Sequence, residues 1–233
     1  MAFSNQSIIS VFEDVCNDLK TTGTYTGVFA SGYTVCTGAN TFKAREVVNI
    51  NNVSYIITEA TDTTFKVKGD VSAFTTYESA YPYFLYGHIL EISNTLKAKN
   101  SGIGTLKYQK YPLIILQLDV ESKYDGLNKS FEYRNINIFI CNITNKTYRA
   151  KDRLEHNFNN VLYPLYEAFV TKLSRHEDII ASNNANNFEH TKIDRFFWGS
   201  QENGNSTNNI FEDYSDAIEI KNLQLNIKNK KCI

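Results

Sequence analysis

Residues 113–120 read Leu-Ile-Ile-Leu-Gln-Leu-Asp-Val, and this run decides how the rest of the chain is arranged. It is short and nearly continuous in branched apolar residues, which is typical of a strand that is covered on both faces. We therefore place the centre of a β-sheet here, directly after Pro112.

Two further segments have the pattern of strands in the same sheet. Residues 131–143 alternate, with Ile136, Ile138 and Ile140 on one face and a mixed set of side chains on the other. Residues 217–227 alternate as well, but the phase slips near Lys221–Asn222, which predicts a β-bulge.

Helical periodicity appears at two places. Residues 4–20 carry apolar side chains at helical spacing and end before Gly23. From about Asp152 to Leu173 a longer apolar stripe predicts a helix that covers the sheet. Pro164 cannot donate a hydrogen bond to the carbonyl of Asn160, so we expect a kink or two abutting segments near Tyr163.

Residues 23–76 differ from both flanks because they consist of short Thr- and Val-rich pieces separated by Gly, Asn and Asp. The pieces lie at 25–29, 34–37, 44–50, 53–58 and 64–68. Asn51 and Asn52 suit a tight turn, since Asn tolerates positive φ. We interpret this stretch as a small β-barrel or meander, inserted into an α+β core of residues 1–22 and 77–233 whose sheet is mostly antiparallel.

Two polar stretches are predicted as loops. The first, residues 94–110, contains Gly102 and Gly104 and follows an aromatic and aliphatic run at 83–92. The second, residues 177–209, is rich in Asn and is interrupted by Phe196-Phe197-Trp198. A loop longer than about 15 residues in a compact domain is usually functional or disordered.

Composition excludes several classes of protein. The 233 residues include 24 basic and 25 acidic side chains, so the chain has no basic excess for binding nucleic acid. The first residues lack a signal peptide, and no apolar run reaches the roughly 20 residues of a membrane span, so we expect a soluble protein made in the cytosol. The four cysteines, Cys16, Cys36, Cys141 and Cys232, have neither zinc-site spacing nor an oxidising compartment that favours disulfides.

Residues able to carry chemistry are scattered. A metal-dependent nuclease could draw together Asp119, Glu121 and Asp194, but no motif fixes their spacing. The histidines show no metal-ligand spacing. Lysines at 97, 99, 107 and 110 and at 228, 230 and 231 are the nearest approach to a phosphate-binding stripe. We therefore expect no catalytic residue, metal or cofactor.

Two aromatic clusters are the candidate interaction residues. Phe196, Phe197 and Trp198 cannot all point into one core. They therefore either hold the 177–209 loop against its own sheet or dock on a neighbouring chain. Tyr81, Tyr83 and Tyr86 present the same two alternatives. Exposed aromatics also suit a glycan-binding platform, which stays a minor alternative.

The order of the elements outside the insert resembles the tail-terminator and tail-completion family of tailed bacteriophages. Four strings carry this resemblance, which covers about two thirds of the chain: Tyr86-Gly87-His88, Lys110-Tyr111-Pro112-Leu113-Ile114, Leu162-Tyr163-Pro164-Leu165-Tyr166 and Asp213-Tyr214-Ser215-Asp216-Ala217-Ile218. The insert and the 177–209 stretch depart from the minimal pattern of the family.

The resemblance implies a non-enzymatic virion protein that is made in the cytoplasm of a bacterial host. It would form a homo-oligomeric ring, hexameric or dodecameric, at the head–tail joint or at the end of the tail tube. Its expected neighbours are further copies of itself and portal, connector or tail proteins, with at most non-specific contact with passing DNA and none with a membrane. Projecting loops and open strand edges suit the heterologous interfaces of such rings. A metal-dependent nuclease and a glycan-binding module are the alternatives.

Overall fold

The computed structural model describes residues 6–101, 110–126, 130–180, 189–198, 200–203, 206–209 and 213–228. The chain divides into two compact units. Unit 1 comprises Met1–Leu19, Phe84–Thr95 and Pro112–Ile233, and unit 2 comprises Lys20–Tyr83 and Leu96–Tyr111. The fold is mixed α+β and its sheets are mostly antiparallel, as predicted.

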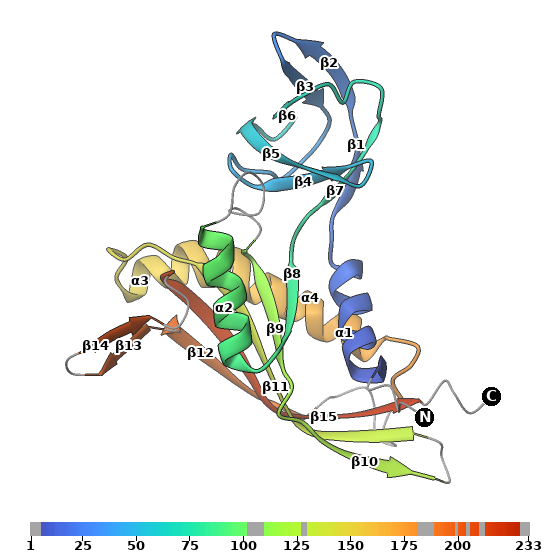
Figure 1. Cartoon of the computed structure of the whole chain (residues 1–233), viewed down its shortest axis with the longest axis vertical. Coiled ribbons are helices and arrows are strands. Elements are labelled where there is room, and N and C mark those ends of the chain that lie inside the picture. Colours follow the sequence, from blue (N-terminus) through green and yellow to red (C-terminus); the bar gives the residue numbers. More distant parts are fainter. Residues whose placement is uncertain are drawn as a thin grey trace. The chain divides into compact units, whose positions relative to one another are not determined.

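Unit 2 contains a seven-stranded sheet that is nearly closed into a barrel (Figure 1). Its strand order is β1-β7-β4-β5-β6-β3-β2. The strands are β1 (Thr22–Thr24), β2 (Thr26–Ala30), β3 (Tyr33–Thr37), β4 (Val47–Ile50), β5 (Val53–Ala60), β6 (Thr64–Lys68) and β7 (Thr76–Ser79). The prediction of a small antiparallel β module is therefore confirmed.

Local sequence explains the turns and the core of unit 2. Asn51 and Asn52 have φ values of 49° and 62° and connect β4 to β5, so the predicted tight turn has the positive φ angles of a type I′ hairpin. Inward-facing residues build a core of their own: Tyr25, Cys36, Phe42, Val48, Ile50, Ile57, Phe65, Val67, Val71 and Tyr77.

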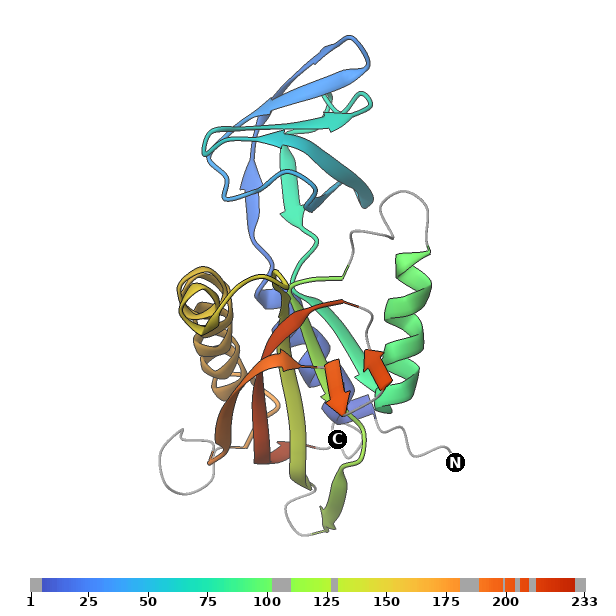
Figure 2. The same ribbon diagram turned by 90° about the vertical axis from the view of Figure 1, so that its left-hand side faces the viewer.

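Unit 1 is built on a six-stranded sheet with the order β12-β15-β11-β9-β8, in which β10 pairs with β11 off this path. The strands are β8 (Tyr83–Gly87), β9 (Leu113–Gln117), β10 (Glu121–Asp125), β11 (Ser130–Ile143), β12 (Thr191–Trp198) and β15 (Ser215–Lys228). Figure 2 shows the strands of this path side by side, from teal β8 to orange β12. β9 is an interior strand, and four of its residues are fully buried, so the prediction that both faces are covered is confirmed.

The bulge predicted near Lys221–Asn222 is confirmed and has a counterpart on the neighbouring strand. The register between β11 and β15 shifts twice, once on either side of the Ile136–Leu223 pair. Asn135 and Asn222 have φ values of 55° and 57°, and Asn is among the few residues that adopt this left-handed conformation at low cost.

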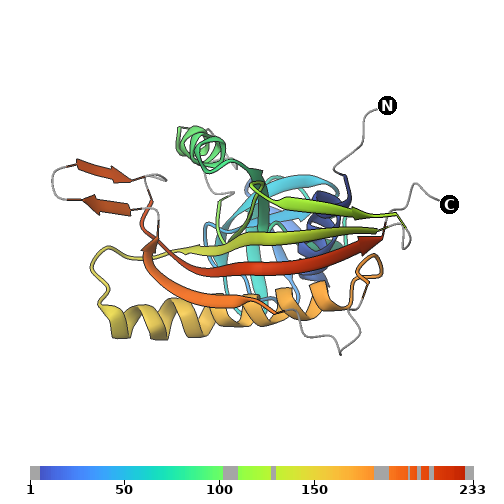
Figure 3. The same cartoon turned by 90° about the horizontal axis from the view of Figure 1, so that it is seen from below.

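Three abutting helical segments replace the single long helix. They are α3 (Ala150–Arg153), the π-helix η2 (Leu154–Leu162) and α4 (Tyr163–Ser174), and they run along β12 in Figure 3. The predicted break at Tyr163 is confirmed. Pro164 lies in the first turn of α4, and the backbone N–H of Tyr163 bonds the carbonyl of Phe158, five residues back. Because proline supplies no N–H, the chain cannot continue regular α-helical bonding through this point.

The core of unit 1 lies between the sheet and its helices. The N-terminal helix α1 (Gln6–Asp18) contacts α4, β9 and β15, close to the predicted 4–20 range. Ile8, Val11 and Phe12 of α1 join Phe158 and Phe169 of the helical row. The isoleucines predicted on one face of the 131–143 strand all belong to this core.

Two predicted loops contain regular structure, so those predictions were wrong. Residues 94–100 belong to α2 (Ile89–Asn100), where Ile92 and Leu96 are buried, and residues 102–109 lie outside the described part. Within 177–209, β12 is a paired edge strand, followed by the two-stranded ribbon β13 (Ser200–Asn203) and β14 (Ser206–Asn209). Tertiary pairing with β15 overrides the polar composition of this segment. Residues 181–188 lie outside the described part.

Candidate functional site

The edge strand β12 is held against the helical row by alternate side chains. The hydroxyl of Tyr166 lies 2.7 Å from Nε2 of His190, just before the strand. Tyr163 donates a 2.6 Å hydrogen bond to Asp194, and the ring of Phe196 meets Phe158 edge to face at 5.2 Å. Because strand side chains alternate, these contacts all fall on the one face of β12 that looks at η2 and α4.

Lys192 and Asp194 add an ion pair to the contacts between β12 and the helical row. The ammonium of Lys192 lies 2.8 Å from an Asp194 oxygen and 4.3 Å from the centre of the Tyr163 ring. Burial, together with the hydrogen bond to Asp194, raises the pKa of Tyr163 to about 12, so its phenol stays protonated and keeps donating.

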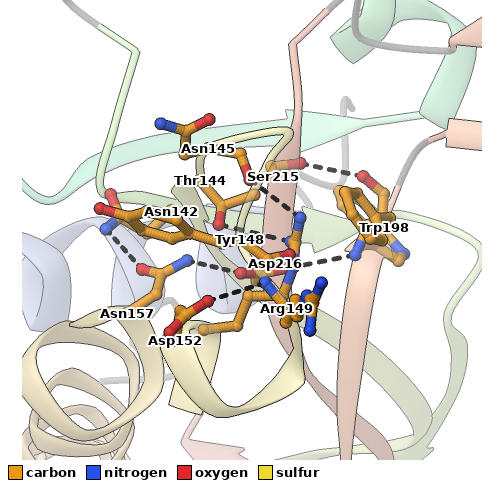
Figure 4. Close-up of polar contacts among 12 residues, drawn as sticks. Asn142, Thr144, Asn145, Tyr148, Arg149, Asp152, Asn157, Trp198, Ser215 and Asp216 are labelled. Atoms are coloured by element: carbon orange, nitrogen blue, oxygen red, sulfur yellow. Dashed lines mark hydrogen bonds and ion pairs between the residues drawn. The ribbon is translucent and has the colours of Figure 1, made fainter. Parts of the chain in front are cut away.

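A buried ion pair lies at the far end of β12. Arg153 is 1% exposed and Asp216 is 0% exposed, and their nearest atoms are 2.5 Å apart. Arg153 also donates to the backbone carbonyls of Asn145 and Tyr148. The amide of Asn157 donates to the other Asp216 oxygen at 2.9 Å, and Figure 4 shows the two side chains pointing toward each other. The pair therefore joins β15, the helical row and the 144–148 turn.

The end of β12 closes over this ion pair. The backbone N–H of Phe197 donates to Asp216 at 3.1 Å, and the Phe197 ring lies 3.3 Å from the guanidinium carbon of Arg153. The indole of Trp198 stacks on Phe139 of β11 with centroids 4.4 Å apart. Both side chains are half-buried, whereas Phe196 is 43% exposed. Within the chain, Phe197 and Trp198 thus hold the strand against its own sheet.

The opposite edge of the sheet is apolar. Tyr86 on β8 is 47% exposed, Leu90 in the first turn of α2 is 62% exposed, and Leu118 after β9 is 39% exposed. The backbone N–H of Leu118 donates to the carbonyl of Gly87, which places the end of β9 beside the end of β8. We call these three residues the β8 patch.

The other two tyrosines of the second predicted cluster belong to unit 2. Tyr81 packs against the core of unit 2, and its hydroxyl lies 3.4 Å from Glu46. Burial raises the pKa of Glu46 above its ordinary value, although an N–H from Lys43 opposes this shift. Burial also raises the pKa of Tyr81 and Tyr83, and the nearby Glu46 charge adds to both shifts. Sequence reasoning missed Glu46, because an isolated glutamate carries no pattern.

The acidic residues of the nuclease alternative are spread over the sheet. Glu121 pairs with Arg134 of β11, whereas Asp194 pairs through Ile218 with Ile140 of β11. Six residues along a strand correspond to about 20 Å. Asp119 bonds Gln117 instead of a second carboxylate. Over the described residues, no three His, Cys, Asp or Glu side chains form a group able to hold a metal ion.

The lysines and cysteines have separate surroundings. Lys110 is buried and bonds the Asn100 side chain, and burial lowers the pKa of Lys99. Cys16, Cys36 and Cys141 are buried thiols without a disulfide. Lys107, Lys230, Lys231 and Cys232 lie outside the described residues.

Comparison with protein-family models, curated proteins and solved structures gives no match to this chain. None of the helices in the described ranges has the length and apolar character needed to cross a membrane.

Proposed function

We propose that the chain is a non-enzymatic structural protein of a tailed-bacteriophage virion, which assembles as a homo-oligomeric ring at the head–tail joint or at the end of the tail tube. We also propose that the fold of unit 1 is that of a tail terminator. The resemblance of the sequence supplies the setting, and one observation supports assembly: the sheet of unit 1 ends in two strands, β8 and β12, that have exposed apolar side chains beside them.

The two edges differ, as a ring requires. Phe196, which is 43% exposed, lies on β12, and the β8 patch lies at the other edge. A patch that meets a different patch on the next copy forms a heterologous interface, which closes into a ring when the rotation allows. The charged side chains of β12 are paired within the chain, Lys192 with Asp194 and Arg195 with Glu219, so they do not oppose an incoming strand.

Light scattering across a concentration series, with negative-stain imaging, tests this proposal. Wild-type protein should form rings. Leu90→Lys blocks one edge and Phe196→Lys blocks the other, so neither variant should form rings alone. A mixture of the two should stop at a species of twice the 26.6 kDa mass of one chain, because each variant keeps one working edge.

Val28→Lys is the matched control, since Val28 is 64% exposed but belongs to unit 2. It should assemble like wild type. A monomeric wild type at every concentration, or rings formed by both edge variants, would contradict the proposal.

A further inference from the structure

The chain leaves β12 through a strained bulge. Arg195 pairs with Ala217 and Trp198 pairs with Ser215, so β12 uses one residue more than β15 between these pairs. Phe197 lies within the bulge at a φ of 49°. A bulky residue in this left-handed region is an outlier that persists only when its surroundings hold it there.

Several contacts hold Phe197 and Trp198 in place, among them a hydrogen bond from the Ser215 hydroxyl to the Trp198 carbonyl and an edge-to-face contact of the Phe197 ring with Tyr214. The Phe197 N–H bonds Asp216, its ring covers the Arg153 guanidinium, and Trp198 stacks on Phe139. Arg153 is itself fixed by its ion pair with Asp216 and by two backbone carbonyls, and Asp216 accepts a further bond from Asn157, so the pair forms a rigid receptor for the bulge. The strained backbone of Phe197 therefore favours detachment of the bulge from the Arg153–Asp216 pair, whereas the side-chain contacts keep the bulge attached to it.

We propose that Phe197 and Trp198 form a latch, closed in this structure, that holds the end of β12 on the Arg153–Asp216 pair and that opens about the Phe197 backbone when a second copy binds the β12 edge. A hinge is typically a loop or element-terminal residue that absorbs a large change in φ and ψ, and Phe197 lies one residue before the end of β12. Only the identity of the binding partner rests on the proposed ring function.

Acrylamide quenching of Trp198, the single tryptophan of the chain, reports on the latch in dilute, monomeric protein. Phe197→Leu keeps an apolar side chain but loses the π face on Arg153, so it should raise the open fraction by about thirtyfold, the ratio expected for a desolvated cation–π contact. Phe197→Tyr keeps the ring and should behave like wild type. Phe196→Leu is the matched control, since Phe196 contacts Phe158 and not Arg153.

Circular dichroism checks that each variant is folded, and Phe197→Met replaces Phe197→Leu if the latter does not fold. Equal quenching of the wild-type and Phe197→Leu proteins would overturn the latch, as would equal effects of the Phe196 and Phe197 variants.

Self-association is measured separately on wild type and the Phe197 variants. If a second copy selects the open latch, Phe197→Leu should associate at lower concentration than wild type. Weaker association would overturn opening upon binding. A wild type that never associates would refute the ring, whereas the quenching comparison would still decide the existence of the latch.

Discussion

Asp216 carries its charge at a position that water does not reach. Its carboxylate accepts hydrogen bonds from Arg153 and Asn157 of the helical row and from the backbone of Phe197 on β12, two segments that are far apart in the sequence. A buried ion pair contributes little net stability relative to apolar residues, but an unpaired buried charge is costly. The pair therefore fixes which segments come together more than it adds to the total free energy of folding.

Asp216→Ala should lower the free energy of unfolding by about 3–5 kcal/mol, because it leaves the Arg153 guanidinium buried without its partner. Urea denaturation measures the change. Arg134→Ala is the control: Arg134 is 45% exposed in its pair with Glu132, and loss of such a surface pair costs about 0–1 kcal/mol. Equal losses for the two variants would contradict a special role for the buried pair.

The raised pKa of Glu46 should make stability depend on pH with the opposite sign to that expected for most carboxylates. Because burial raises its pKa in the folded state, the fold favours protonated Glu46, and stability is lost as pH rises through that raised value. Glu46→Gln should therefore raise the melting temperature at pH 7, and the gain should vanish below the ordinary value of 4.5, where folded and unfolded chains are both protonated. A gain that is independent of pH would count against the shift.

At the scale of elements, asparagines determine where strands bend. Asn222 adopts a left-handed φ in a strand that continues on both sides. The residue type at this position therefore affects stability although the side chain is exposed. Asn222→Gly should be neutral or stabilising, whereas Asn222→Val should cost about 1–2 kcal/mol, since a β-branched residue is strained there. Asn226→Val in the same strand is the control and should cost little. Thermal melts of the three variants decide this.

The same scale shows what the sequence alone could predict. Continuous apolar runs and clear alternation identified β9, β11 and β15, and proline chemistry located the break before α4. The pattern failed at α2 and β12. Of the last four residues of α2, none is fully buried, and five of the eight residues of β12 are exposed. Such elements owe their structure to neighbours that are distant in sequence, and this is also why the Arg153–Asp216 pair could not be anticipated.

At the scale of the molecule, two separate cores imply two cooperative units. Phe65 lies in the core of unit 2 and Phe158 in that of unit 1, and both are essentially inaccessible to solvent. Phe65→Ala and Phe158→Ala should each cost about 3–5 kcal/mol. Scanning calorimetry should show each variant lowering a different transition. If both lowered one common transition, the chain would melt as a single unit.

The contacts of α1 have a consequence for synthesis on the ribosome. Its apolar stripe, Ile8, Val11, Phe12 and Val15, packs against α4 and β15, yet about 145 residues separate α1 from the start of α4. At roughly 5–20 residues per second, about 7 to 30 seconds pass before synthesis reaches α4, and β15 follows later still. During that interval the β-strands of unit 2 have already been synthesised, while the apolar stripe of α1 has no partner to pack against. The nascent chain thus exposes the apolar face of α1 to ribosome-associated chaperones until the rest of unit 1 has been synthesised and can pack against it.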